Sequence, residues 1–386
     1  MEIGDLYIRK LSGPVSFRYL LPKEQAFIEK AEEGIFLPIV ILLGDIHDSE
    51  DDRCEPCDEK EECYLVESDS FLGALDQLAE RYPIDFYTEH APPNENKKKK
   101  RTSIGVLFDK LTRKIEGCHD VKVRGTKEYQ CTFPNVRWHY FDTRFWTGSF
   151  ESDVSVAAGF LKHLKRPDVD LTIEHFVFHS NPLFQKFLLC LIQAHSKEWS
   201  MDVVSRYLSK YLDQEIQTSR NWSRVYKELN TFKIDLRLYC LFSLGYHGVA
   251  SPSDQLRDKV RHLELLPSLY NYIFNHSRLG KGRYKELVED VLNLWVSYTA
   301  CLLDVYFMSR MLKTPKGSSN SYVSVSFFGT NHCKSLSSYL EHELELYDLK
   351  YDSGKESDRC LRINGTISFN EDLETYSRRR VLYQGI

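Results

Sequence analysis

Three kinds of feature are missing from this sequence, and each absence argues against a class of protein. No stretch reaches the roughly 18 consecutive apolar residues of a membrane span, and the longest apolar run, IFLPIVILLG, is much shorter. The opening MEIGDLYIRKLSG is charged and lacks the apolar core of a secretory signal. Basic residues are not in excess, because the net charge is -5, so nucleic-acid binding is not expected. We therefore expect a soluble intracellular protein without a membrane span.

The composition is that of an ordinary globular protein, with 42% hydrophobic and 28% charged residues. A chain of 386 residues can form one large domain with insertions, or two domains. Aromatic residues make up 13% of the chain, and because Tyr and Phe bury large areas, we expect a well-filled core. None of these features indicates a substrate or an oligomeric state.

The first part of the chain, residues 1–150, alternates between strand and helix patterns. Residues 34–44 form a continuous apolar run, which is typical of a strand covered on both faces. Apolar side chains at helical spacing predict a helix over 68–82, and further strands are predicted over 83–89 and 135–146. This alternation predicts an α/β fold with a parallel or mixed central sheet and helices on both faces.

The middle of the chain, residues 151–315, has a different pattern, because several of its segments carry helical spacing. We interpret it as a large helical insertion. Residues 316–386 return to the α/β pattern and complete the core that the first part begins. They contain, in order, a predicted strand, helix and edge strand: 321–329, 334–347 and 359–369.

Polar residues follow the predicted strands where their loops begin. They are Asp45 and His47, Glu89 and His90, Asp142 and Arg144, and Asn331 and His332. In open α/β sheets, functional sites lie at the carboxyl ends of the strands. If these strands are neighbours, the residue types of a metal-assisted or acid–base hydrolase converge on one rim. Each residue also has a plainer explanation, since polar turn residues often follow strands and Asp142 with Arg144 could form a structural ion pair.

Two Gly-x-x-His motifs, GDIH at 44–47 and GTNH at 329–332, flank a glutamate that closes the strand in DFYTE. This arrangement resembles the superfamily that joins TraB/TIKI proteins, ChaN-type proteins and erythromycin-esterase-like enzymes. The resemblance implies that His47, Glu89 and His332 are site residues. The TIKI branch is regarded as a group of metal-dependent proteases. The esterase branch uses His and Glu without an obligatory metal.

The same resemblance implies close backbone approach at Gly44 and Gly329. The first motif has Asp45 where the family more often has Glu, which is a mild departure. Three short motifs carry the resemblance, and the helical middle of the chain matches nothing that we can assign. Together with DTR and DVYFMSRML, the motifs also resemble uncharacterised proteins of large DNA viruses.

A hydrolase of peptide or ester bonds is the function that this resemblance implies. His47 and His332 would offer nitrogen ligands, and Glu89 an oxygen ligand, to a divalent Zn, Mn or Fe ion. The metal would acidify a bound water, and a carboxylate of Glu89 or Asp45 would take its proton. Without metal, a histidine would act as the base.

Arg144, oriented by Asp142, would hold an anionic substrate group or a developing oxyanion. Two other functions stay open at this point. One is a catalytically inactive structural or virion-associated protein that keeps the fold. The other is a metallophosphoesterase, whose opening Asp-x-His fits GDIHDS, although the later motifs of that family are missing from the sequence.

Three of the ten cysteines, Cys54, Cys57 and Cys63, cluster shortly after the first motif. The Cys54-x-x-Cys57 spacing suits a zinc site, but a complete zinc signature contains two such pairs. Zinc binding, a disulfide within this loop and free thiols therefore all remain open. Either zinc or a disulfide would brace the loop that follows His47.

Overall fold

The structure is a computed structural model. It describes residues 1–45, 57–89, 110–111, 114, 119–123, 126–130, 132–140, 239, 303–312, 320–353, 360–363 and 367–384. The chain divides into two compact units, Met1–Asp142 with Arg310–Ile386, and Thr143–Ser309. The sequence prediction places these divisions after residues 150 and 315. The predicted helical insertion lies outside the described residues, except for Tyr239 and residues 303–312, of which 303–311 are helical.

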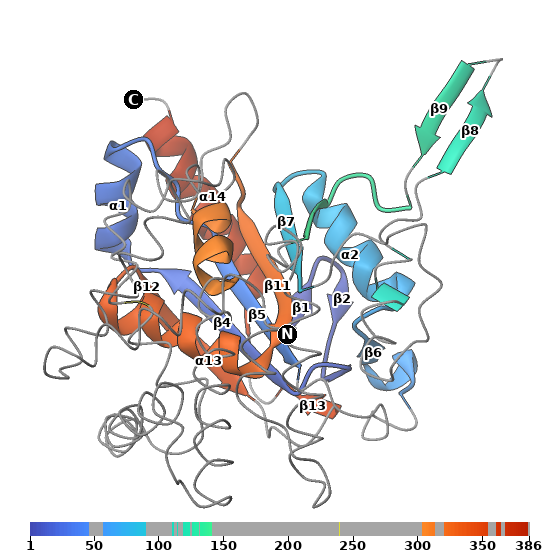
Figure 1. Ribbon diagram of the computed structural model, residues 1–386, viewed down its shortest axis with the longest axis horizontal. Helices are drawn as coiled ribbons and strands as arrows, with labels where there is room; N and C mark the ends of the chain where they lie inside the picture. The colour runs from blue at the N-terminus through green and yellow to red at the C-terminus, as the bar shows by residue number, and fades with distance from the viewer. Residues whose placement is uncertain are drawn as a thin grey trace, which may run out of the picture. The chain divides into compact units, whose positions relative to one another are not determined.

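The first unit is built on a mixed sheet of six strands (Figure 1). In spatial order they are β10 (Arg137–Tyr140), β7 (Ile84–Thr88), β11 (Val323–Gly329), β5 (Ile39–Asp45), β4 (Ser16–Pro22) and β12 (Tyr347–Ser353). The first four are parallel to one another, whereas β4 runs antiparallel to its neighbours β5 and β12. Strand β11, from the last part of the chain, thus lies between β5 and β7 from the first part.

The two central strands, β5 and β11, are buried along their whole length. Successive side chains of a strand point to opposite faces of the sheet. Ile39, Ile41 and Leu43 of β5 belong to the main hydrophobic core, together with the alternate residues Val323, Val325 and Phe327 of β11. The intervening residues of both strands face the other side of the sheet, which is the face that carries the candidate site.

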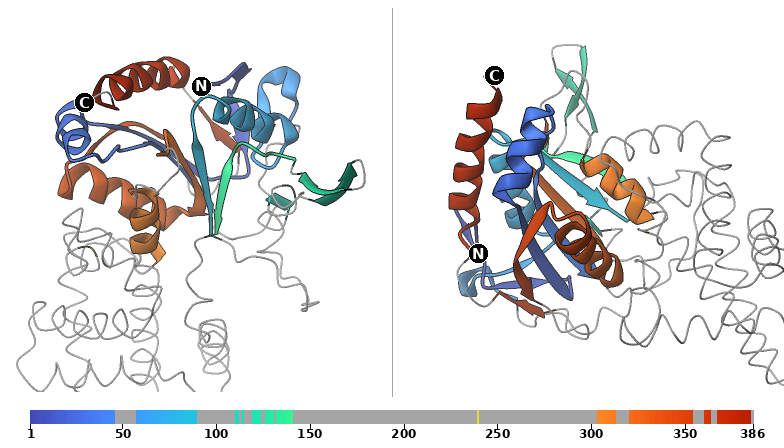
Figure 2. Two further views of the ribbon diagram at one scale, coloured as in Figure 1. Left: turned by 90° about the horizontal axis from the view of Figure 1, so that it is seen from above. Right: turned by 90° about the vertical axis from the view of Figure 1, so that its left-hand side faces the viewer.

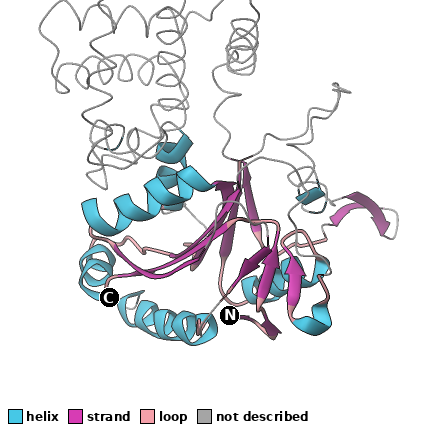
Figure 3. Cartoon of the chain, turned by 90° about the horizontal axis from the view of Figure 1, so that it is seen from below, coloured by secondary structure: helices cyan, strands magenta, loops and turns pink. Residues whose placement is uncertain are grey.

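Helices lie on both faces of this sheet (Figures 2 and 3). On the core face, α1 (Glu24–Glu32), α2 (Asp69–Ala79) and α14 (Phe369–Gln384) contribute side chains to the main hydrophobic core. On the opposite face, α13 (Thr330–Ser338) packs on β5 and β4 and continues into a π-helical turn, η4 (Tyr339–Glu343). The fold therefore agrees with the α/β class that the sequence predicts.

The start of α13 differs from the prediction, which placed a helix over 334–347. Gly329 is both the last residue of β11 and the N-cap of α13, so the helix begins at Thr330 without an intervening loop. At its other end the helical segment stops at Glu343, the last residue of η4, and Tyr347, the last residue of the predicted helix, already begins β12. Thr and Asn are weak helix formers and are common in turns, which is why the sequence pattern starts the helix too late.

The remaining strands form small sheets. β13 (Cys360–Arg362), β3 (Lys10–Ser12) and β6 (Cys63–Leu65) make a three-stranded sheet, next to a 3-10 turn, η1 (Glu59–Glu61). Two further pairs are β1 (Glu2–Ile3) with β2 (Leu6–Tyr7), and β8 (His119–Val123) with β9 (Thr126–Gln130). The predicted edge strand over 359–369 is confirmed in part, since Cys360–Arg362 form β13 at the edge of the three-stranded sheet, whereas the edge strands of the main sheet are β10 and β12. Within the described ranges, no helix has the length and apolarity to cross a bilayer.

Candidate functional site

A hydrogen bond joins the glutamate of the second predicted motif to the glycine of the third. The backbone N–H of Gly329 donates to Glu89 Oε2 at 2.9 Å. The backbone N–H of Glu89 in turn donates to the carbonyl of Phe327 at 3.1 Å, so the β7–β11 ladder continues as far as the glutamate. Because Gly329 is the N-cap of α13, the Glu89 carboxylate lies at the positive end of that helix, where a negative charge is favoured.

The first motif meets the third at Gly44, where β5, β4 and α13 come into close contact. A Cβ atom on Gly44 would lie 2.1 Å from Ser16 Oγ and 2.9 Å from Thr330 Cα. Ser16 Oγ and Thr330 Oγ1 are themselves hydrogen-bonded at 2.9 Å, which holds both neighbours in place. The contact with Thr330 is to backbone, which cannot turn aside as a flexible side chain can. Only glycine therefore fits at this position without a shift of the first turn of α13.

Asp45 ends β5 directly beside this contact. It pairs in register with Gly329 of β11, and its side chain is only 2% exposed. Since β11 also pairs with β7, the carboxyl ends of β5, β11 and β7 adjoin at one rim. The structure thus brings together three of the segments selected from the sequence, those of Asp45, Glu89 and Gly329–His332.

His332 lies in the first turn of α13 and not in a loop. The residue is 8% exposed, and its ring meets the ring of Phe328 edge-on with centroids 5.9 Å apart. Phe328 belongs to the sheet face opposite the main core, so His332 stands over that face at the end of β11. The imidazole is therefore held by helix geometry and aromatic packing and is not on a solvated turn.

Several predicted site residues lie outside the described residues. They are His47, His90, Asp142, Arg144 and Cys54. The predicted juxtaposition of His47 and His332 and the predicted oxyanion role of Arg144 therefore stay predictions. In the described part of the chain, no three His, Cys, Asp or Glu side chains are grouped as a metal site. A metal centre at this rim would need a ligand from outside these residues, and the ligand predicted from the sequence is His47.

A polar cluster that the sequence analysis missed lies on β7 and β10. Asp85 accepts hydrogen bonds from Arg137 Nε at 2.6 Å and Arg137 Nη2 at 3.0 Å, and its Oδ1 lies 2.9 Å from His139 Nε2. The His139 ring also stacks on the ring of Tyr87, with centroids 4.8 Å apart and planes at 20°. The signal in the sequence is a two-residue period, since Asp85 lies between Ile84 and Phe86, and Arg137 and His139 flank Trp138.

Asp85 is buried, and its surroundings favour the ionised carboxylate. Burial alone raises the pKa of Asp85, but the hydrogen bonds and positive charges of His139 and Arg137 outweigh this effect and lower it below its ordinary value. The carboxylate is thus a fixed acceptor for the two β10 side chains. A buried charge of this kind is stable only when it is paired and hydrogen-bonded, as here.

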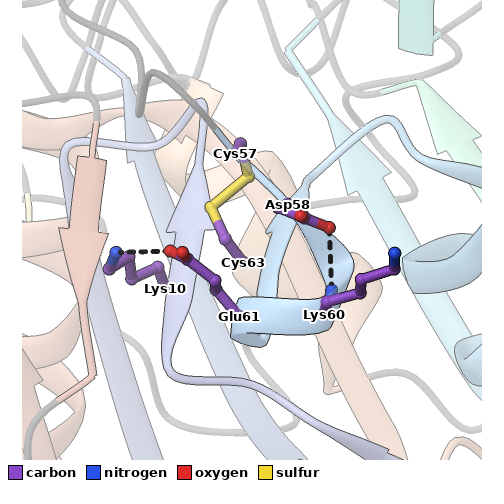
Figure 4. The surroundings of a disulfide bond; sticks show 6 residues. All are labelled: Lys10, Cys57, Asp58, Lys60, Glu61 and Cys63. Atoms are coloured by element: carbon purple, nitrogen blue, oxygen red, sulfur yellow. Dashed lines mark hydrogen bonds and ion pairs between the residues drawn. A yellow bond between two sulfur atoms is a disulfide. The ribbon is translucent and has the colours of Figure 1, made fainter.

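The cysteine loop contains a disulfide between Cys57 and Cys63, whose Cα atoms are 5.2 Å apart (Figure 4). These two residues therefore do not offer thiolates to zinc. Around the bond, Asp58 accepts from the backbone N–H of Lys60, and Lys10 forms an ion pair with Glu61. Cys360 is also disulfide-bonded, whereas Cys333 is a free, buried thiol.

Comparisons of this chain with protein-family models, with curated proteins and with solved structures give no match. The resemblance to the TraB/TIKI, ChaN and erythromycin-esterase-like superfamily therefore depends on three short motifs. A fold by itself does not specify a reaction. Function has to be inferred from the residues at the rim and on the sheet face beside it.

Proposed function

We propose that this protein is a hydrolase of ester or peptide bonds that uses Glu89 and His332 at the carboxyl ends of its parallel strands. The observation that carries the proposal is the hydrogen bond from Gly329 N–H to Glu89 Oε2. It joins the glutamate to the helix turn that bears the histidine. These two segments are far apart in sequence, and they contain the glutamate and the second histidine of the motif pattern.

In the proposed reaction, Glu89 is the general base. Its carboxylate takes a proton from water while the water oxygen forms a bond to the substrate carbonyl carbon. The carbonyl π electrons move onto the carbonyl oxygen, and His332 donates a hydrogen bond to this developing oxyanion. The tetrahedral intermediate then expels an alcohol or an amine. Asp45 ends the neighbouring strand β5 and is buried, but alternation along β5 places it on the face of Leu43, opposite that of Glu89, so we assign the base to Glu89.

The proposed metal binding depends on His47, because the described residues alone do not form a ligand set. With His47, the residues His332 and Glu89 would supply the nitrogen and oxygen ligands that suit Zn, Mn or Fe. A bound ion would acidify a water molecule. Calorimetric titration of chelator-treated protein with Zn²⁺ and with Mn²⁺ tests this part: binding by the wild type and its loss in His47→Ala would support a metal site. Absence of binding in the wild type would leave the metal-free reaction.

The hydrolase itself is tested with p-nitrophenyl acetate and with fluorescently labelled casein. We expect Glu89→Gln and His332→Ala each to lower kcat/KM by about a hundredfold or more, the usual contribution of one acid–base or oxyanion group. The matched control is His342→Ala, because the side chain of His342 is 65% exposed and lies on η4, away from the strand ends. The proposal is wrong if Glu89→Gln and His332→Ala both hydrolyse the probes at the wild-type rate.

A further inference from the structure

A band of polar side chains crosses the sheet face that carries the rim. Its members, here called the polar face, are Ser324 and Ser326 of β11, Asp85 and Tyr87 of β7, and Arg137 and His139 of β10. The strand registers place them in two rows, since Asp85 is paired with both Ser324 and Arg137, and Tyr87 with both Ser326 and His139. The alternate residues of β7 and β11 belong to the hydrophobic core on the opposite side.

His139 is held in position by two contacts with other members of this face. Its Nε2 is 2.9 Å from Asp85 Oδ1, and its ring plane is held by stacking on Tyr87. Because the Asp85 carboxylate accepts at Nε2, the neutral ring carries its proton on Nε2. Nδ1 can then exchange a proton with another partner. Within the described residues Nδ1 makes no hydrogen bond, and the side chain is 24% exposed. In catalytic histidines, a carboxylate bound to one ring nitrogen orients the ring in the same way, and the other nitrogen transfers the proton.

A second observation concerns a buried hydroxyl on the same face. Ser324 is fully buried, and its hydroxyl has no hydrogen-bond partner among the described residues. Ser324 lies directly opposite Asp85 in the β7–β11 register. Buried polar groups are nearly always hydrogen-bonded, so an orphan hydroxyl beside a buried carboxylate is an unusual feature of this face.

The polar face and the rim are continuous. The backbone N–H of Glu89 continues the β7–β11 ladder, so Glu89 follows the strand pattern in which every second side chain, here Asp85 and Tyr87, shares one face. It therefore projects on the same side as His139. Strand spacing and residue rise put the Cα atoms of Glu89 and His139 about 8 Å apart. His332 stands on the other side of Glu89, above the end of β11.

We infer that His139 is the general acid of this site, and that Asp85 is the residue that positions it. The inference rests on the proposed hydrolase, in which Glu89 takes the proton of the attacking water and no residue is yet assigned to the leaving group. The imidazolium of His139 gives its Nδ1 proton to the leaving oxygen or nitrogen as the bond from that atom to the carbonyl carbon breaks. His139 is then neutral and keeps its Nε2 proton on Asp85. Glu89 releases the water proton to solvent, and His139 regains a proton from solvent.

The test compares two esters that differ in their need for an acid. p-Nitrophenolate leaves without protonation, whereas the alkoxide of benzyl acetate must be protonated. We expect His139→Ala to lower kcat/KM for benzyl acetate by about a hundredfold and to leave that for p-nitrophenyl acetate nearly unchanged. Asp85→Asn should give the same selective pattern with a smaller loss, because it disturbs the tautomer and keeps the imidazole. His139→Gln, which retains an N–H for Asp85, serves if the alanine variant does not fold.

The outcomes separate this inference from the proposed function. Equal loss for both esters in His139→Ala or in His139→Gln would show a structural role and overturn the inference. No loss for either ester would overturn it as well. If Glu89→Gln lowers both rates while His139→Ala changes neither, the hydrolase stands and the general acid lies elsewhere. If wild type and Glu89→Gln hydrolyse both esters equally slowly, the proposed function fails and the role of His139 fails with it.

The tautomer gives a readout that does not depend on activity. Long-range proton–nitrogen correlation spectra of histidine-labelled protein, recorded where the ring is neutral, should show His139 protonated at Nε2 in the wild type. In Asp85→Asn the signal should shift toward a mixture of tautomers. A wild-type His139 protonated at Nδ1 would contradict the orientation on which the inference depends.

Discussion

Glu89 and Gly329, 240 positions apart, are joined by a hydrogen bond of 2.9 Å from the glycine N–H to the glutamate carboxylate. The bond crosses from the end of β7 to the N-cap of α13, so a side chain of one strand satisfies a backbone donor at the start of a helix. Glu89 consequently has a structural role in addition to the chemical role proposed for it, and experiments on this residue must separate the two.

Substitution of Glu89 by Ala and by Gln separates the roles. Glu89→Ala removes the acceptor for Gly329 N–H and should lower the free energy of unfolding by about 1–2 kcal/mol, as loss of a helix cap does. Glu89→Gln keeps an oxygen acceptor and should cost clearly less, although it cannot act as a base. Urea denaturation followed by circular dichroism measures both. Equal stability of the two variants would mean that the hydrogen bond to Gly329 contributes nothing to folding.

A methyl group at Gly44 should push α13 away from β5. The added Cβ would lie 2.9 Å from the Thr330 backbone, so we expect Gly44→Ala to destabilise the protein by about 1–3 kcal/mol, the usual range for overpacking. The control is Gly73→Ala, within α2, where an added Cβ meets nothing within 4 Å. That change should stabilise by up to about 1 kcal/mol, because alanine is the better helix former. Thermal unfolding of both variants provides the comparison.

The positions of the central strands followed from the sequence because their signal is local. The apolar runs around Ile39–Asp45 and Val323–Gly329 predict buried strands, and buried parallel strands place their loops at one edge. The bounds of α13 did not follow, since Thr330 and Asn331 carry no helical preference and the start of the helix is set by tertiary contacts at Gly44 and Glu89. Such contacts join segments that no local pattern links.

The cluster of Asp85, Arg137 and His139 could be predicted only in part. Alternation in each strand indicates that these side chains share a face of the sheet, but the register that sets Arg137 opposite Asp85 appears only in the structure. The residues after β10, where the sequence predicts site residues at Asp142 and Arg144, lie outside the described part. A site on the face of a strand is harder to recognise than one at its end, because a buried polar residue in a strand leaves no turn signal.

Arg380 should be the most important side chain of the C-terminal helix for stability. It is fully buried, donates to the carbonyls of Ser321 and Asn320 at 2.8 and 3.0 Å, and lies over the ring of Tyr322 at 4.0 Å. Arg380→Ala leaves two carbonyls without these donors and opens a cavity, so we expect a loss of about 3–5 kcal/mol.

The control for Arg380 is on the same helix. Arg378 is 79% exposed and, among the described residues, pairs only with Glu374 one turn away, so Arg378→Ala should change stability by less than about 0.5 kcal/mol. Urea denaturation measures the loss of stability in both variants, provided that the m-value is the same as in the wild type. A loss below about 1 kcal/mol in Arg380→Ala, well short of the cost of an ordinary core cavity, would contradict the assigned role.

The Cys57–Cys63 disulfide should be protected from alkylation and should contribute to stability. Disulfides persist mainly in oxidising surroundings. We expect Cys57 and Cys63 to resist alkylation in unreduced protein, as measured by peptide mass mapping. Cys57→Ser with Cys63→Ser should lower stability by about 2 kcal/mol, the value for so short a loop. Rapid alkylation of both residues without a reductant would show that the bond is not formed.

The Asp85 carboxylate should make stability depend on pH in the acid range. Its pKa is lowered in the folded protein by His139 and Arg137, against the opposing effect of burial. A lowered pKa contributes stability that is complete above the unfolded value of about 3.9 and is lost as pH falls through the folded value. Asp85→Asn should therefore be less stable than wild type by about 3 kcal/mol near pH 5, and the gap should narrow toward pH 2.5.

Asp372 provides a comparison of opposite sign. Burial raises the pKa of Asp372, and the hydrogen bond from Tyr19 only partly offsets this effect. A raised carboxyl pKa means that the folded state binds the proton more strongly, so wild type should lose stability relative to Asp372→Asn as pH rises from 3 to 6. Urea denaturation of the three proteins across this range measures both gaps. If the Asp85→Asn gap is flat, or runs in the same direction as that of Asp372→Asn, the Asp85 carboxylate is not held in its charged form by His139 and Arg137.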